Sequence, residues 1–242
     1  MAKQEAISFM EFKNKFNSED ACREHLFKMR WPDGFKCPKC GNETYYVIST
    51  RNRYECTDCH YQASVTVGTV MEKTHIKLEK WFWAIYFVGR DKRGCSAMML
   101  SKELEISYKA AWFMLHRIRK AMKDRDSQYL LAGVVELDDA YFGSPDEGGK
   151  RGRGTSKAKV MVGLSLNKEG HPQFLKMQVV NDLKKETIAE FAHSNVQTGS
   201  TISSDAYSSY KNLQAEGYKL EAKVFNPKED EEHLKWLHTI VS

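Results

Sequence analysis

Four cysteines stand in two pairs whose spacing is typical of a metal site. Cys37 and Cys40 form one C-x2-C pair, Cys56 and Cys59 form the other, and fifteen residues separate the pairs. Two such knuckles can bring four thiolates into a closed tetrahedron around Zn²⁺, and Gly41 supplies the tight backbone that a knuckle needs. Four unrelated core cysteines would rarely fall into this arrangement. The sequence therefore predicts a structural zinc site, because four thiolates leave the ion no open position for catalysis.

Three acidic side chains interrupt a segment that otherwise has the composition of a β-strand. Residues 134–142 are Val-Val-Glu-Leu-Asp-Asp-Ala-Tyr-Phe. Alternation along a strand places Glu136 and Asp138 on one face, and Asp139 on the other face with Val135, Leu137 and Tyr141. A buried strand rarely carries charges without a reason. A metal-facing acid is one interpretation of this pattern, and a half-exposed edge strand is the other.

A second short strand ends on an acid. Residues 200–205 are Ser-Thr-Ile-Ser-Ser-Asp, and a helical segment follows Asp205. If the two strands are neighbours, Asp138 and Asp205 can converge on Mg²⁺. Such carboxylates hold two metal ions roughly 3.5 to 4 Å apart, which activate a water or a 3′-hydroxyl and stabilise the leaving oxygen of a phosphodiester. Asp138 and Asp205 are therefore the candidate catalytic and magnesium-binding residues.

Two short helices joined by a three-residue turn are predicted after Cys95. Residues 96–104 have an apolar inner face, residues 105–107 form the turn, and Ser107 is a plausible N-cap for a second helix from Tyr108. This pattern is typical of a helix-turn-helix whose second helix enters the major groove. An amphipathic helical hairpin with a solvated basic face is the alternative. The predicted inner face of the second helix comprises Ala111, Leu115, Ile118 and Met122, and its predicted DNA-binding residues are Lys109, His116, Arg117, Arg119 and Lys120.

A glycine-rich basic segment follows the acidic strand. Residues 148–157 are Gly-Gly-Lys-Arg-Gly-Arg-Gly-Thr-Ser-Lys. Beside a metal site, a mobile arm of this composition could grip DNA phosphates through Lys150, Arg151 and Arg153. A solvated loop without a ligand is the simpler interpretation of the same composition.

The properties of the whole chain limit the classes of protein to which it can belong. Its 242 residues exceed the usual size of one domain, and the net charge of +5 permits nucleic-acid binding. From Arg90 to Arg125, ten basic side chains stand against four acidic ones. Residues 1–30 have no apolar core of signal-peptide length, and the longest apolar run, residues 81–88, is far shorter than the roughly 20 residues of a membrane span. We therefore expect a cytoplasmic protein with reduced cysteines and no membrane partner.

These candidate sites require an α+β chain of several domains. Helical spacing predicts a helical lead-in over residues 1–30. Short aromatic and β-branched runs at residues 45–48 and 64–67 predict small hairpins within a zinc ribbon over residues 31–70. The helix-turn-helix DNA-binding region is expected over residues 75–130, and alternating strands and helices predict a third, strand-rich domain over residues 131–242.

Taken in order, these segments resemble the zinc-ribbon-bearing DDE transposases of bacterial insertion sequences, specifically the ISXO-like transposase family. The likeness spans nearly the whole chain, and the order of its motifs is more specific than any one of them. Asp139 stands where many relatives carry Glu, on the face away from Asp138. The motifs are Trp31-Pro32-Asp33-Gly34 before the first cysteine pair, the second cysteine pair, Ser107 to Trp112, Glu136 to Gly143, and Ser204-Asp205-Ala206-Tyr207.

The resemblance implies an RNase H-like catalytic domain, which is a mixed sheet flanked by helices. It implies that Asp138 and Asp205 are the first and second ligands of a catalytic Mg²⁺ or Mn²⁺. It further implies metal-dependent cleavage and transfer of DNA strands by a homo-oligomer in the bacterial nucleoid, with double-stranded transposon ends bearing terminal inverted repeats and target DNA as partners.

The family has a third catalytic residue, Glu or Asn, in a helix after the last core strand, and the match ends before it. We therefore expect a C-terminally incomplete catalytic domain whose third residue lies beyond Ser242, and which binds DNA but supports little strand transfer. The acids Glu229, Asp230, Glu231 and Glu232 are weak candidates as substitutes, because such a charge run is usually a solvated surface. A zinc-ribbon DNA-binding protein, a transposase remnant without catalysis, or a nuclease without transfer activity remain alternatives.

Overall fold

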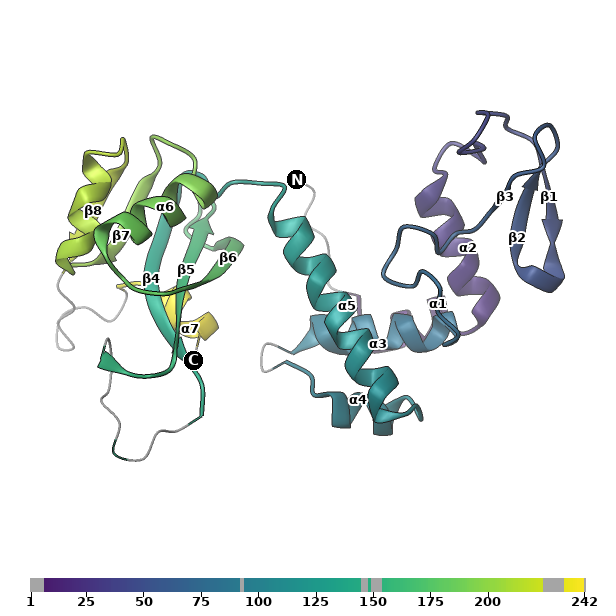
Figure 1. Cartoon of the computed structure of the whole chain (residues 1–242), viewed down its shortest axis with the longest axis horizontal. Coiled ribbons are helices and arrows are strands. Elements are labelled where there is room, and N and C mark those ends of the chain that lie inside the picture. Colours follow the sequence, from purple (N-terminus) through teal and green to yellow (C-terminus); the bar gives the residue numbers. More distant parts are fainter. Residues whose placement is uncertain (1–6, 92–93, 145–147, 149–153, 224–232, 242) are drawn as a thin grey trace. The chain divides into compact units, whose positions relative to one another are not determined.

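The computed structural model describes residues 7–91, 94–144, 148, 154–223 and 233–241. The chain divides into two compact units, Met1–Lys123 and Asp124–Ser242 (Figure 1). No helix in the described ranges has the length and apolar character needed to cross a membrane.

The first unit begins with two helices, α1 (Phe9–Lys15) and α2 (Glu19–Arg30), where the helical lead-in was expected. Each starts after a serine, because a serine hydroxyl can accept a first-turn N–H that has no partner within the helix. Ser8 Oγ accepts from Glu11 N–H at 3.2 Å, and Glu11 accepts in return from Ser8 N–H, which completes a capping box. Ser18 caps α2 in the same position, through Ala21 N–H.

A small antiparallel sheet follows in the order β1-β2-β3. It consists of β1 (Tyr45–Ile48), β2 (Arg53–Cys56) and β3 (Gln62–Ala63), with the short 3-10 helix η1 (Ser49–Arg51) between the first two strands. The hairpin expected at residues 45–48 is present. The strand expected at residues 64–67 is wrong, since β3 ends at Ala63. There Ser64 Oγ accepts from Thr66 N–H at 3.3 Å, which favours a turn over a continued strand.

Three helices complete the first unit: α3 (Leu78–Arg90), α4 (Ala97–Glu103) and α5 (Tyr108–Asp126). The expected helix–turn–helix arrangement is present in α4 and α5. Ser96 caps α4, Ser107 Oγ accepts from Ala110 N–H at 3.2 Å, and Glu105 takes a left-handed φ of 48° in the turn. One continuous cluster of buried apolar side chains runs from Phe12 to Ile118. The lead-in, the cysteine-bearing sheet and the helices therefore share one core.

The second unit is built on a mixed five-stranded sheet in the order β6-β5-β4-β7-β8. β4 lies at its centre, antiparallel to β5 and parallel to β7. An edge position for the acid-bearing strand is therefore excluded. The strands are β4 (Val134–Phe142), β5 (Ala158–Leu166), β6 (Pro172–Val180), β7 (Thr201–Asp205) and β8 (Lys219–Lys223).

Helices cover both faces of this sheet (Figure 1). On one face α6 (Lys185–Asn195) and the 3-10 helix η3 (Ser208–Gln214) pack against Val135 and Leu137 of β4. On the other face α7 (Lys235–Val241) packs against Ala140 of β4 and the apolar side chains of β5. The expected α+β chain, with a cysteine cluster and a mixed sheet flanked by helices, is confirmed. The alternation expected along β4 is also correct, because Val135 and Leu137 face α6 whereas Ala140 faces α7.

Candidate functional site

The four paired cysteines converge on one point. Their Sγ atoms all lie within 4.8 Å of one another, with Cys37 to Cys59 at 3.6 Å and Cys40 to Cys56 at 3.5 Å. Ligands about 2.3 Å from a tetrahedral Zn²⁺ are about 3.8 Å apart, so the cluster has the size of a zinc site. The four thiols fit structural zinc, as the spacing predicted.

The backbone at each cysteine pair explains how the thiolates are held. Gly41 and His60 each directly follow the second cysteine of a pair, and both adopt a left-handed φ, of 79° and 56°. Their N–H groups donate to the carbonyls of Cys37 and Cys56 and close the two knuckles. Backbone N–H groups, first that of Cys59, lower the pKa of Cys56 to about 6. The backbone of the second knuckle therefore favours the thiolate form of Cys56.

Asp138 and Asp205 lie on neighbouring parallel strands at the same height. The register of β4 and β7 pairs Glu136 with Ser203 and Leu137 with Ser204, so the next position pairs Asp138 with Asp205. Both acids therefore stand on the α7 face, at the carboxyl ends of adjacent strands. The structure thus brings together the two acids that the sequence singled out.

The environment of Asp138 opposes its negative charge. Burial raises the pKa of Asp138, and the nearby carboxylates of Asp139 and Asp205 raise it further. Only 17% of the Asp138 side chain is exposed. A divalent cation would relieve this repulsion, and carboxylate oxygens are the ligands that Mg²⁺ and Mn²⁺ accept. The donor set therefore fits such an ion.

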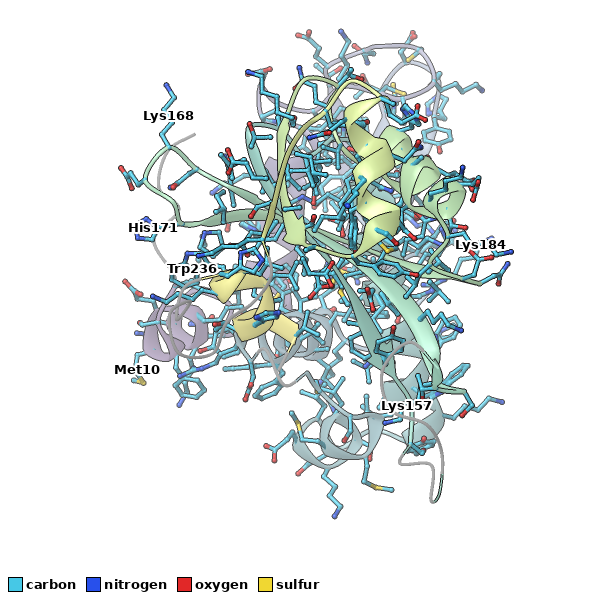
Figure 2. All side chains as sticks on the ribbon, turned by 90° about the vertical axis from the view of Figure 1, so that its left-hand side faces the viewer. Met10, Lys157, Lys168, His171, Lys184 and Trp236 are labelled. Atoms are coloured by element: carbon cyan, nitrogen blue, oxygen red, sulfur yellow. The ribbon has the colours of Figure 1, made fainter. Side chains whose placement is uncertain are left out.

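Helix α7 contacts the acidic strand through two residues that were not predicted as site residues. Leu237 N–H donates to Glu136 Oε2 at 2.8 Å, and His238 Nε2 lies 3.4 Å from Asp138 Oδ2. Trp236 of the same helix stacks edge-on against His171 in the β5–β6 turn, with ring centroids 6.1 Å apart (Figure 2). Strand alternation placed Glu136 on the Asp138 face, but no spacing signal linked this strand to a helix a hundred residues later.

The predicted recognition helix α5 presents a mixed aromatic and basic surface. Lys109, His116 and Lys120 are exposed on one side of the helix. Trp112 and Phe113 lie on the same side, with exposed fractions of 48% and 50%. The rings of Trp112 and His116 contact each other at a tilt, with their centroids 4.0 Å apart. We define the α5 surface as these five residues, which combine positive charge with aromatic area.

Two arginines predicted on this surface make hydrogen bonds within the first unit. Arg117 Nη1 donates to the carbonyls of Val70 and Glu72 at 2.9 and 2.6 Å. Arg119 Nη2 donates to the carbonyl of Cys95 at 3.3 Å. These bonds give both side chains a role in holding α5 to neighbouring loops. Met122, expected on the inner face, is 53% exposed because that face ends with the core at Ile118.

A hollow lined by lysines lies where α6 begins and β7 has just ended. Its volume is about 400 Å³, and three lysines, two acids and a tyrosine are among the residues that line it: Lys159, Lys184, Lys185, Asp182, Glu186 and Tyr207. Tyr207 N–H donates to Asp205 Oδ1 at 3.1 Å, so this hollow adjoins the acid pair. Lys150, Arg151 and Arg153 of the glycine-rich segment lie outside the described residues, as do the acids at positions 229–232.

The cysteine cluster and the acid pair both lie in regions of the chain that match known transposase families. A family described as "Transposase zinc-ribbon domain" matches residues 17–62, and one described as "ISXO2-like transposase domain" matches residues 130–242. The chain belongs to the IS1595 family of transposases. These two matches contain the four paired cysteines of the first unit and the acid pair, Asp138 and Asp205, of the second.

A relative from Halobacterium salinarum, described as "Uncharacterized protein in transposable element ISH50", is 32% identical over 158 residues. The match covers 64% of this transposase and 51% of the relative, so this transposase spans about half the length of the relative that it matches. That organism is an archaeon, and a bacterial source stays a prediction. A solved "Mos1 transposase paired-end complex with left transposon end" is 10% identical, with a TM-score of 0.22 over 66% of this chain and 70% of that one. A likeness this weak carries no argument.

Proposed function

We propose that this transposase binds the terminal inverted repeats of an insertion sequence and catalyses metal-dependent cleavage and transfer of DNA strands. The observation that carries the proposal is the parallel pairing of β4 and β7, which sets Asp138 beside Asp205 on one face of the sheet. A protein that only binds DNA has no need of two facing acids, one of which, Asp138, has its pKa raised by burial and by the neighbouring carboxylates.

Asp138 and Asp205 would hold Mg²⁺ or Mn²⁺ in this proposal. When bound, such ions activate the attacking oxygen and stabilise the leaving oxygen of a phosphodiester. The part of the protein is to fix two carboxylates on rigid neighbouring strands and to limit solvent around Asp138. Tyr207 N–H orients the carboxylate of Asp205. Rigid placement matters because rate falls steeply when reacting groups are displaced by an ångström.

DNA binding would be divided between two basic surfaces. The α5 surface suits a duplex, because lysines neutralise phosphates while aromatic and histidine side chains contact base edges in the major groove. Lys159, Lys184 and Lys185 would hold phosphates beside the acid pair. The zinc site would be structural, and the active species would be a homo-oligomer that holds two transposon ends together.

The decisive experiment compares cleavage and binding in matched variants. Asp138→Asn and Asp205→Asn keep the side-chain shape and remove the charge that holds the ion. In a form of the protein extended past Ser242 and incubated with labelled element ends and Mg²⁺ or Mn²⁺, each variant should lose cleavage and joining by at least about 100-fold while duplex affinity changes less than about 3-fold. Asp20→Asn is the matched control, because Asp20 lies in α2 of the first unit and 94% of its side chain is exposed.

Normal cleavage by the Asp138 and Asp205 variants would refute the metal assignment. Duplex binding by the unaltered extended form without any cleavage under either metal would favour a DNA-binding remnant instead.

A further inference from the structure

The contact between α7 and β4 has a feature that helix packing alone does not require. Leu234 occupies the N-cap of α7, since its carbonyl accepts the first helical bond from His238 N–H at 3.0 Å. A leucine side chain offers no acceptor for the unpaired N–H groups of the first turn. The carboxylate of Glu136 takes that role from the neighbouring strand, through Leu237 N–H at 2.8 Å. The start of this helix is thus capped by the acidic strand itself.

Burial makes this cap a strong constraint. Glu136 is the one buried acid among the described residues, and burial raises its pKa. A buried carboxylate is expensive unless a donor compensates for lost water, so it is retained where its position matters. Leu234 and Leu237 pack into the same buried cluster as Val160, Val162 and Leu164. Together the apolar contacts and the cap fix both the rotation and the height of α7 on the sheet.

The residue that follows the capped position is His238. Glu136 and Asp138 are two positions apart on the same strand face, a separation of about 6.7 Å along β4. With Leu237 held at Glu136, the next side chain of the helix reaches the level of Asp138, and His238 Nε2 lies 3.4 Å from Asp138 Oδ2. Adjacent ligands of an octahedral ion at about 2.1 Å lie about 3.0 Å apart. The imidazole therefore stands near the place of a ligand adjacent to Asp138.

We infer that His238 supplies a nitrogen ligand to the divalent cation held by Asp138 and Asp205, and that Glu136 is the positioning residue that sets His238 there. The inference rests on the proposed metal site and adds a third protein ligand to it. Neutral imidazole binds Mn²⁺ more readily than Mg²⁺, whereas carboxylates accept both. The site should therefore prefer manganese more strongly than two carboxylates alone would.

Binding requires a modest adjustment of side chains. Among the described residues, only the four paired cysteines form a set of three or more potential ligands whose atoms all lie within 4.8 Å of one another. The ligand atoms of Asp138, Asp205 and His238 therefore do not all lie this close together. The carboxylate of Asp205 and the imidazole of His238 must therefore close on the ion by rotation. His238 has the freedom to do so, because 53% of its side chain is exposed.

The test uses the full chain with its zinc site loaded and Mn²⁺ as the probe. Pulsed electron paramagnetic resonance should detect nitrogen-14 modulation typical of a directly bound imidazole. His238→Gln should abolish that modulation and weaken Mn²⁺ binding about 10-fold or more, with a smaller effect on Mg²⁺. His193→Gln is the matched control, because His193 also faces a carboxylate, that of Glu216 at 2.9 Å, but on the exposed side of α6.

The Glu136 variants test positioning separately. Glu136→Gln keeps an acceptor for Leu237 N–H and should retain most of the nitrogen modulation. Glu136→Ala removes the cap and should weaken both the modulation and Mn²⁺ affinity, by about 10-fold. Equal behaviour of the two variants would overturn the positioning role of Glu136.

The outcomes separate this inference from the proposed function. Mn²⁺ binding that depends on Asp138 and Asp205 but shows no nitrogen modulation, or the same modulation after His238→Gln, overturns the inference and leaves the acid pair intact. Mn²⁺ binding that is absent, or unchanged in Asp138→Asn and Asp205→Asn, overturns both.

Discussion

At the scale of single residues, the clearest property of the second unit is that two aspartates have opposite electrostatic surroundings. Burial and neighbouring carboxylates raise the pKa of Asp138. The hydroxyl of Thr187, at 2.6 Å, and the N–H of Lys184 lower the pKa of Asp182. The first arrangement suits a carboxylate that awaits a cation. The second suits a carboxylate whose task is to begin a helix.

These shifts predict stability changes of opposite sign. A carboxyl whose pKa is raised by folding destabilises the native state at neutral pH, and the penalty disappears as pH falls through the folded pKa. Without metal at pH 7, Asp138→Asn should therefore raise the melting temperature by a few degrees. The gain should shrink on acidification. With saturating Mn²⁺ it should reverse, because only the native chain binds the ion.

The companion change is Asp182→Asn. A carboxyl with a lowered pKa stabilises the native state above its unfolded pKa, and this contribution is lost as pH falls through the folded pKa. The variant should therefore melt at a lower temperature at pH 7, with a difference that narrows in acid. Calorimetry of both variants across pH checks the pair, and shifts of the same sign would contradict it.

At the scale of elements, close packing between β5 and α6 depends on a residue without a side chain. Gly163 lies in the middle of β5, and an added Cβ would stand 2.8 Å from Leu131 Cδ1 and 3.4 Å from Phe191 Cε1. Both neighbours are fully buried, so neither can move into solvent.

Gly163→Ala should therefore lower the free energy of unfolding by about 1 to 2 kcal/mol through overpacking. Denaturant titration measures this loss. Adding Leu131→Ala opens space at the same point. The double variant should therefore lose less free energy of unfolding than the two single variants lose in sum. Gly89→Ala is the control for the substitution itself, because Gly89 lies in α3, where an added Cβ would meet no described atom within 4 Å. That change should be neutral or stabilising by up to about 1 kcal/mol.

The basic residues of α5 predict two separable effects. Lys109→Ala and Lys120→Ala should weaken duplex binding, and each lost phosphate contact should reduce the logarithmic salt slope by about 0.9. Lys109→Arg keeps the charge and should keep the slope. Arg117→Ala should instead lower stability by about 1.5 to 3 kcal/mol, because it removes charged hydrogen bonds to two loop carbonyls. If Arg117→Ala reduces the salt slope of duplex binding as much as Lys109→Ala does, Arg117 also contacts DNA phosphates.

At the scale of the whole molecule, each unit has its own core. The cluster from Phe12 to Ile118 lies entirely in the first unit and includes Cys37 and Cys56. The two clusters on either face of the five-stranded sheet lie in the second unit. Loss of zinc should therefore disturb one unit and spare the other.

Purified protein should contain one zinc per chain, and Cys56→Ser should reduce that content sharply. After chelation, hydrogen exchange should accelerate in α2 and in β1 to β3, while amides of β4 and β5 keep their protection. Acidification should release zinc as well, since the ligands must be thiolates. Equal loss of protection in β4 would show that the two units unfold as one.

The sequence by itself determined which residues are candidates for the chemistry of this protein. The cysteine spacing predicted the zinc cluster, because the ligands of each pair are neighbours in the chain and need little tertiary information. Strand alternation predicted which face of β4 carries Asp138, because the period of a strand is a local property. The turn before α5 was likewise visible in Ser107 and its surroundings.

Tertiary structure decided what local patterns cannot contain. Only the parallel pairing of β4 with β7 could set Asp138 at the height of Asp205, since that register is fixed by packing between segments far apart in sequence. Only the tertiary structure brings the loop carbonyls of Val70 and Glu72 within hydrogen-bond distance of Arg117, a contact that helical spacing could not indicate. The cap from Glu136 to Leu237 spans 101 residues and follows no periodicity. It forms because burying α7 on the sheet leaves an unpaired N–H that only the facing strand can satisfy.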